Sequence, residues 1–94
     1  MTILQVEHTI SNFERWKGAF DKDPINRRKS GVKRYRVLRP TDDQNYVIVH
    51  LEFDNPRSAQ EALAALLKLW EKVEATIMVN PRTRMLDIVE SMEL

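Results

Sequence analysis

The chain contains no cysteine and only two glycines among its 94 residues. Without cysteine, a disulfide framework, a thiolate metal site and a thiol nucleophile are all excluded. With so few glycines there is no glycine-rich phosphate loop and no dinucleotide-binding fingerprint, and no serine lies in a nucleophile motif. We therefore expect neither ATP- nor NAD-dependent chemistry, and we predict that the protein uses no cofactor.

Long hydrophobic runs are also missing. The longest apolar run, Ala62 to Leu67, is far too short to cross a bilayer. The N-terminal MTILQVEHTI has no basic start, no long apolar segment and no small-residue cleavage site, so we expect no signal peptide. These features predict a cytoplasmic protein with no membrane association. Residues 1–94 fit a single domain near the lower size limit for independent folding, so pairing into an oligomer would add core.

Positive charge is concentrated in one stretch. Residues 26–39, NRRKSGVKRYRVLR, hold seven Lys and Arg and no acid, although the net charge of the chain is only +1. The remaining residues therefore carry eight bases against fourteen acids. Such an asymmetry creates a local positive field on a nearly neutral molecule.

Strand alternation divides this basic stretch between two faces. Arg34 and Arg36 share one face, whereas Tyr35 points to the other. Three interpretations of the stretch follow. It is a solvated edge strand whose charges discourage unwanted strand pairing. Alternatively, it attracts an anionic ligand, or it forms salt bridges with another subunit. Nucleic-acid binding is the least favoured alternative, because Tyr35 and Tyr46 are the only strand tyrosines available for base stacking.

Hydrophobic periodicity predicts four strands. Alternation of apolar and polar residues places them at Ile3–Ile10, Val32–Leu38, Asn45–Phe53 and Thr83–Val89. The last strand follows a break that we expect at Asn80 and Pro81.

A first helix is predicted after the first strand. Ser11 and Glu14 have the spacing of a capping box, so the helix should start there. Its apolar stripe contains Phe13, Trp16 and Phe20. Pro24 ends the helix or begins a short turn through Lys29, and Gly31 suits the left-handed residue that stops such a turn.

The second helix follows the third strand. Asp54 or Asn55 caps it, and Pro56 occupies a position near its first turn. Its apolar residues recur at spacings of three and four: Ala59, Ala62, Leu63, Leu66, Leu69, Trp70 and Val73. Both helices thus carry large aromatics on apolar stripes, which indicates core packing, although one tryptophan could form the wall of a cavity.

The resulting order, βαββαβ, predicts an α+β fold of the ferredoxin-like type. This fold consists of a four-stranded antiparallel sheet with two helices on one face. The other face, which carries Tyr46, Ile48, His50 and Glu52, is too apolar to be fully solvated and too large for this chain to cover. We therefore expect something else to pack on it.

Three segments resemble a known group of proteins. HTISNFERWKGAFD, GVKRYRVLR and NYVIVHLEFDNPRSAQ, in this order, are similar to the dimeric α+β barrel superfamily, over residues 3 to about 90. Within it, the chain resembles small proteins related to the antibiotic biosynthesis monooxygenases and the stress-responsive A/B barrel proteins. The resemblance implies a homodimer in which two sheets pack face to face and enclose a barrel-like cavity.

The resemblance implies no single activity, because the superfamily includes cofactor-free oxygenases, isomerases, haem-degrading enzymes and ligand-sensing domains. The haem-degrading members use an Asn, Trp and His set. The residues of those types in this chain do not align with that set, so no haem role is transferred.

His50 is the predicted catalytic residue. With Val47 and its neighbours under the helices, His50 projects toward the dimer cavity beside Tyr46 and Glu52, where a neutral imidazole can act as a general base. The alternative is a histidine that only forms a hydrogen bond within the cavity or to the partner subunit. Arg36, Tyr46 and Glu52 are predicted ligand-binding residues.

His8 lies on the face with Leu4 and Val6, which should be covered by the helices. We interpret it as a core or strand-end histidine. Because both sides of a central strand are buried, His8 could instead lie on the cavity face, where it would be a ligand-binding candidate. His8 and His50 could meet across neighbouring strands, but two histidines without a well-placed carboxylate are weak evidence for a metal. An iron site formed with Glu7 or Glu52 is the remaining alternative, and we predict no metal.

These observations lead to one functional hypothesis and two alternatives. The protein is predicted to be a homodimeric, cofactor-independent, monooxygenase-like enzyme that acts on a small aromatic or polyketide-like molecule. The first alternative is a non-catalytic small-ligand-binding or stress-associated protein on the same dimer. The second is a nucleic-acid-binding protein.

Overall fold

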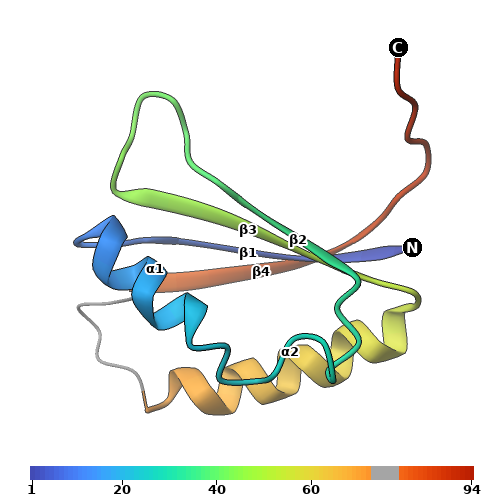
Figure 1. Cartoon of the computed structure of the whole chain (residues 1–94), viewed down its shortest axis with the longest axis horizontal. Coiled ribbons are helices and arrows are strands. Elements are labelled where there is room, and N and C mark those ends of the chain that lie inside the picture. Colours follow the sequence, from blue (N-terminus) through green and yellow to red (C-terminus); the bar gives the residue numbers. More distant parts are fainter. Residues whose placement is uncertain (73–78) are drawn as a thin grey trace.

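The computed structural model describes residues 1–72 and 79–94. The elements follow in the order β1 (Thr2–Thr9), α1 (Phe13–Asp21), β2 (Arg34–Leu38), β3 (Tyr46–Phe53), α2 (Pro56–Trp70) and β4 (Val79–Asp87). The strands form one antiparallel sheet in the order β2-β3-β1-β4, and both helices lie against the same side of it (Figure 1). The predicted α+β, ferredoxin-like fold is confirmed.

Alternation along the two central strands separates a buried face from a partly open one. Leu4 pairs with Leu51 and Val6 with Val49 in the β1–β3 register, and all four side chains are buried under the helices. The core cluster consists of Leu4, Val6, Ile10, Trp16, Val47, Val49, Leu51, Phe53, Ala59 and Ala62. The removal of this apolar surface from water is the main favourable contribution to folding.

Helix α1 begins one residue later than the capping-box spacing predicted. Asn12, not Ser11, is the N-cap, and its side-chain oxygen accepts a hydrogen bond of 2.9 Å from the backbone N–H of Arg15. The cause lies upstream, where the Ile10 side chain is buried and its backbone N–H donates to the carbonyl of Asn45. These contacts keep the chain extended past the end of β1, so the helix cannot start at Ser11.

The sequence offered two candidate N-caps for helix α2, Asp54 and Asn55. Asn55 is the N-cap, with its side chain accepting from the backbone N–H of Ser58 at 2.9 Å, and Pro56 is the first helical residue. Ala59 and Ala62 are buried against the sheet. Val73, which we placed on the same apolar stripe, lies outside the described residues.

Two turns carry residues in the left-handed region. Helix α1 ends at Asp21, and a short turn that contains Pro24 follows it. Asp23, which precedes Pro24, has a φ of 52°. Gly31 has a φ of 95°, which confirms its predicted conformation. Together the turns lead the chain from α1 into β2 at the edge of the sheet.

The last strand differs from its prediction at both ends. Strand β4 covers Val79–Asp87 rather than Thr83–Val89. The expected break at Asn80 is instead a bulge: Asn80 has a φ of 51°, and the pairing register with β1 shifts between Glu7 and Thr9. A bulge takes up the extra residue locally, so pairing with β1 continues on both sides of it.

The face of the sheet opposite the helices is not covered by the described part of the chain; we call it the open sheet face. Residues 88–94 leave the sheet and extend away from the body of the molecule (Figure 1), with Val89, Met92 and Leu94 exposed. Among the described residues, no helix is long and apolar enough to cross a membrane.

Candidate functional site

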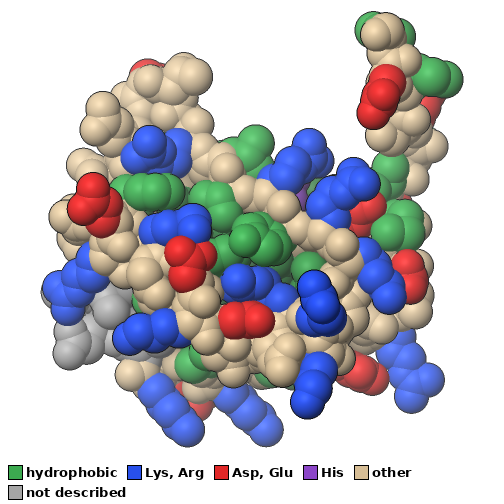
Figure 2. Space-filling view, in the orientation of Figure 1, with side chains coloured by type: hydrophobic (Ala, Val, Ile, Leu, Met, Phe, Trp, Pro, Cys, Tyr) green, Lys and Arg blue, Asp and Glu red, His purple; other side chains and the backbone are tan. Residues whose placement is uncertain are grey.

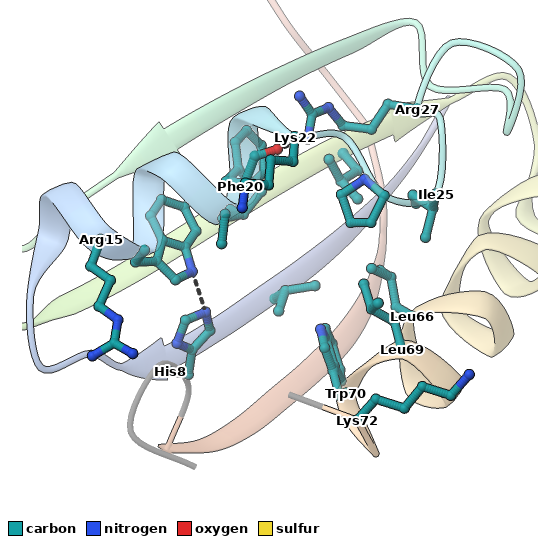
Figure 3. A pocket seen from close by; sticks show the side chains of 16 residues that line it. His8, Arg15, Phe20, Lys22, Ile25, Arg27, Leu66, Leu69, Trp70 and Lys72 are labelled. Carbon is teal, nitrogen blue, oxygen red and sulfur yellow. Dashed lines mark hydrogen bonds between the residues drawn. The ribbon is translucent and has the colours of Figure 1, made fainter. Parts of the chain in front are cut away.

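A cavity of about 440 Å³ lies between α1, α2 and the sheet (Figure 3). We call it the helix-side cavity. Val6, Val49 and Leu51 of the central strands form its floor. Its other lining residues are His8, Arg15, Trp16, Ala19, Phe20, Lys22, Pro24, Ile25, Arg27, Leu66, Leu69, Trp70 and Lys72. The lining is thus mainly apolar and aromatic, as is usual for small-molecule sites.

His8 is a polar group in the wall of this cavity. Only 2% of it is exposed, and its Nε2 accepts a hydrogen bond of 3.1 Å from the indole N–H of Trp16. Because the indole can only donate, the proton of the neutral imidazole must be on Nδ1, which lies 3.2 Å from the backbone carbonyl of Thr9. Burial lowers the pKa of His8 below its ordinary value, and the hydrogen bond to Thr9 opposes this effect. His8 is therefore neutral at pH 7.

An aromatic series runs along α1 beside the cavity. Trp16 stacks on Phe20 with ring centroids 5.2 Å apart, and Phe20 meets the edge of Tyr35 at the same distance. The guanidinium of Arg27 lies 4.0 Å from the Phe20 ring centroid and 4.8 Å from that of Tyr35. Trp70, from the end of α2, lies on the opposite side of the cavity from Phe20 (Figure 3). Trp16, Phe20 and Trp70, which we assigned to the core, thus also form walls of the cavity.

Four cationic side chains surround the cavity, and we call them the rim cations: Arg15, Lys22, Arg27 and Lys72. Figure 3 shows them around the opening, outside the apolar floor. The Asp23 carboxylate lies 3.5 Å from Nε of Arg27 and offsets part of its charge. None of the described residues that line the cavity is acidic.

The open sheet face carries a second polar group of residues. His50 Nε2 lies 2.8 Å from Oε1 of Gln5, and Nε2 of Gln5 donates to the Glu7 carboxylate at 3.3 Å. A carboxylate only accepts, so the Gln5 amide nitrogen faces Glu7 and its oxygen accepts from the N–H of His50. The remaining His50 nitrogen, Nδ1, is buried and has no hydrogen-bond partner among the described residues.

Arg36 is the direct neighbour of His50 across the β2–β3 pair. Burial lowers the pKa of His50 first, and the positive charge of Arg36 lowers it further. Tyr46 bonds to Glu7 on the same face, and its pKa is raised by burial first and then by that carboxylate. The neutral His50 imidazole thus keeps one acceptor, Nδ1, that is shielded from water and unused by the described residues.

The predicted site residues divide between the two faces. His50, Tyr46 and Glu52 share the open sheet face, as strand parity predicted, and the β2–β3 register adds Arg36 to it, whereas His8 lies on the helix side. Residues on opposite faces of a sheet cannot coordinate one ion, and no cluster of metal-ligating side chains occurs among residues 1–72 and 79–94. The catalytic role of His50 stays a prediction.

The sequence reasoning missed the helix-side cavity and the rim cations. One signal was present: Arg15, Ala19 and Lys22 have the i, i+4, i+7 spacing of a single helical stripe. A gap between two helices, however, depends on how far apart they pack. Such a distance is not encoded in the periodicity of either helix.

The basic stretch is used mainly by the fold. Strand β2 is an edge strand, and Arg39 lies 4.3 Å from the ring centroid of Phe13, as Arg27 does near Phe20. Figure 2 shows Lys and Arg side chains spread over the visible face with acidic side chains between them. Arg27 and Arg39 contact rings of α1, whereas Arg36 lies beside His50 on the open sheet face, so the stretch does not form one continuous basic stripe.

Comparison with known proteins identifies the fold. No protein-family model and no curated protein sequence matches the chain. A protein from Nitrosomonas europaea, described as a candidate antibiotic biosynthesis monooxygenase, superimposes with a TM-score of 0.72 at 16% identity, covering 96% of this chain and 100% of that one. SnoaB, a cofactor-independent oxygenase from Streptomyces nogalater, gives 0.74 at 14% identity, covering 97% and 94%.

A dimeric ferredoxin-like protein from an uncultured marine organism superimposes with a TM-score of 0.67 at 9% identity, and both chains are covered completely. At these identities the likeness establishes a common fold. The resemblance inferred from the sequence is thus confirmed at the level of the fold.

Proposed function

We propose, from the fold shared with monooxygenase-like structures, that this protein binds a small aromatic or polyketide-like molecule in the helix-side cavity and oxidises it without a cofactor. The observation that carries the proposal is the cavity itself, about 440 Å³ in volume with the neutral His8 in its wall. Pockets for small organic ligands commonly measure about 300–1,000 Å³. Support also comes from SnoaB, which has the same fold and is a cofactor-independent oxygenase.

Such a reaction balances without a cofactor when the substrate supplies the electrons. Conversion of an activated ring methylene to a carbonyl consumes one dioxygen, places one oxygen atom in the product and releases the other as water. The apolar walls would exclude bulk water, and a base would remove a proton from the methylene carbon. His8 can serve as this base only if its Nε2 exchanges the Trp16 N–H for the substrate. His50 lies on the other side of the sheet, so it could be the base only for a substrate bound at the open sheet face and not for one in the helix-side cavity.

A non-catalytic ligand-binding protein is the alternative. One observation favours it: both nitrogens of His8 are already engaged, by Trp16 and by Thr9. A histidine in this state stabilises the cavity wall and has no free lone pair for proton abstraction.

A homodimer through the open sheet face is part of the proposal. Ile48 and Leu86 lie on this face by their register and are half-buried, and Leu38 adds an apolar side chain that is 40% exposed. Similar structures from uncultured marine organisms are described as dimeric. The cytoplasmic location stays a prediction.

Oxygen uptake with a hydroxyanthrone tests the function. Dithranol, a tricyclic hydroxyaryl ketone with an activated methylene, is offered to the protein in an oxygen electrode, and its binding is measured separately by fluorescence. We expect protein-dependent oxygen uptake. His8→Gln should retain binding and lose most turnover if His8 is the base, whereas His50→Ala, a change on the opposite face of the sheet, should retain both. Loss of turnover in His50→Ala would instead place the reaction at the open sheet face. Binding without oxygen uptake by the wild type would contradict the enzyme proposal and favour the alternative.

A further inference from the structure

Among the residues that the structure describes, the charges that line the helix-side cavity are all of one sign. Its apolar floor and walls come from both helices and the central strands, whereas its charged residues are the rim cations alone. The chain as a whole is nearly balanced, with 15 bases and 14 acids. The described lining, with four bases and no acid, therefore departs from the average surface of this protein, even though Asp23 beside the cavity offsets part of the charge of Arg27.

The position of the cations relative to the apolar walls defines the shape of a suitable ligand. Phe20 and Trp70 lie on opposite sides of the cavity, and the rim cations lie around its opening (Figure 3). Lys22 caps the end of α1, and Lys72 follows the end of α2; both are exposed to water. A ring system in the cavity would keep a negatively charged substituent at the opening, where it stays partly hydrated. The substituent would then be attracted by the lysines without the large penalty of burying a charge.

We infer that the helix-side cavity takes an apolar organic anion, a flat ring system that bears a carboxylate, sulfonate or phenolate group held at the rim by Lys22 and Lys72. This inference rests on the proposed function of the cavity as a small-molecule site. It adds the charge of the ligand and the orientation in which the ligand enters, with the rings inward and the anion outward.

Two dyes of the same skeleton test the inference. Anilinonaphthalene sulfonate is an aromatic anion, and N-phenylnaphthylamine is the same molecule without the sulfonate; both gain fluorescence in apolar sites. We expect the anion to bind more tightly to the wild type. Raising the salt concentration should reduce the affinity for the anionic dye and leave that for the neutral dye unchanged, because salt screens exposed charges.

Two double variants that remove the same charge test whether the preference for the anionic dye comes from the rim cations. Lys22→Gln with Lys72→Gln removes two rim cations, and we expect it to weaken binding of the anionic dye roughly three- to tenfold without changing binding of the neutral dye. Lys29→Gln with Lys68→Gln removes the same charge from exposed positions outside the cavity and should change neither affinity. Thermal unfolding of all variants checks that the fold is retained.

A third variant locates both dyes. Ala19 lines the cavity, so Ala19→Trp fills it and should abolish binding of both dyes. If neither dye binds, or if Ala19→Trp has no effect on either, the cavity is not a small-molecule site and the proposed function fails with the inference. If the neutral dye binds in the cavity but the two lysine pairs behave alike toward the anion, the inference is overturned and the proposed function stands.

Discussion

His8 is 2% exposed although imidazole is a polar group, and its environment explains how the fold tolerates it. Trp16 donates to one ring nitrogen, and the other is within bonding distance of the Thr9 carbonyl. A buried polar group that keeps its hydrogen bonds costs little, whereas the same group left unpaired costs about 1–3 kcal/mol. The His8–Trp16 pair therefore links β1 to α1 at the wall of the cavity.

The lowered pKa of His8 predicts a pH-dependent stability. Below the ordinary value of 6.5, the unfolded chain takes up a proton on His8 that the folded protein resists. The stabilisation from His8 is thus complete above pH 6.5 and is lost as the pH falls through the lowered value. We expect the advantage of the wild type over His8→Gln to be constant above this pH and to shrink toward about pH 5.

Urea denaturation at a series of pH values measures this effect. The comparison is made in a His50→Gln background, so that only one histidine titrates. A stability difference that stays constant down to about pH 5 would show that His8 does not have a lowered pKa.

At the scale of the elements, α1 and the turn after it each contain one of the two glycines. Gly18 lies inside α1 with no atom within 4 Å of the position that a Cβ would occupy. Gly31 has a φ of 95°, and a Cβ there would meet Ser58 Cβ at 3.5 Å and Phe53 Cδ2 at 3.7 Å, which are ordinary contacts. A Cβ would thus fit at both positions, and the two glycines differ only in their backbone conformation.

Alanine substitutions at the two glycines should change stability in opposite directions. Gly18→Ala is expected to raise the free energy of unfolding by about 0.5–1 kcal/mol, because alanine loses less backbone entropy in a helix. Gly31→Ala is expected to lower it by about 1–2 kcal/mol, because a Cβ is strained in the left-handed region. Urea denaturation measures both, and a stabilised Gly31→Ala protein would contradict the turn geometry.

At the scale of the whole molecule, the two faces of the sheet are used differently. The helices cover one face and leave a cavity, while the other combines apolar side chains such as Ile48 with the His50, Gln5 and Glu7 series. A 94-residue chain cannot cover both faces, because a small domain buries a limited fraction of its surface. A second copy of the chain is the partner that we propose for the open sheet face.

Sedimentation velocity at micromolar concentration tests this assembly. The wild type should be a dimer, and Ile48→Glu should weaken it at least about tenfold by placing a carboxylate in an apolar contact. Leu67→Glu introduces the same charge on α2, where Leu67 is 51% exposed, and should leave the dimer intact. A monomeric wild type, or a dimer unaffected by Ile48→Glu, would exclude this interface.

Local patterns were sufficient for the fold and for the division of residues between faces. Strand parity placed His50 and Tyr46 on one face and indicated the helix-covered face for His8, because side chains alternate strictly along a strand. The β2–β3 register, which the sequence did not show, placed Arg36 beside His50. Asn55 and Gly31 were predictable for the same kind of reason, since caps and left-handed turns select particular residue types.

Tertiary contacts decided the rest. The start of α1 at Asn12 depends on the burial of Ile10 and its bond to Asn45, and the bulge at Asn80 depends on pairing with β1. The helix-side cavity depends on the separation of α1 and α2 over the sheet. Periodicity reports which side of an element is apolar, but the distance between two elements is set by the packing of residues far apart in the chain. For this reason the sequence determined the faces of the sheet, and only the tertiary structure located the cavity and its cationic rim.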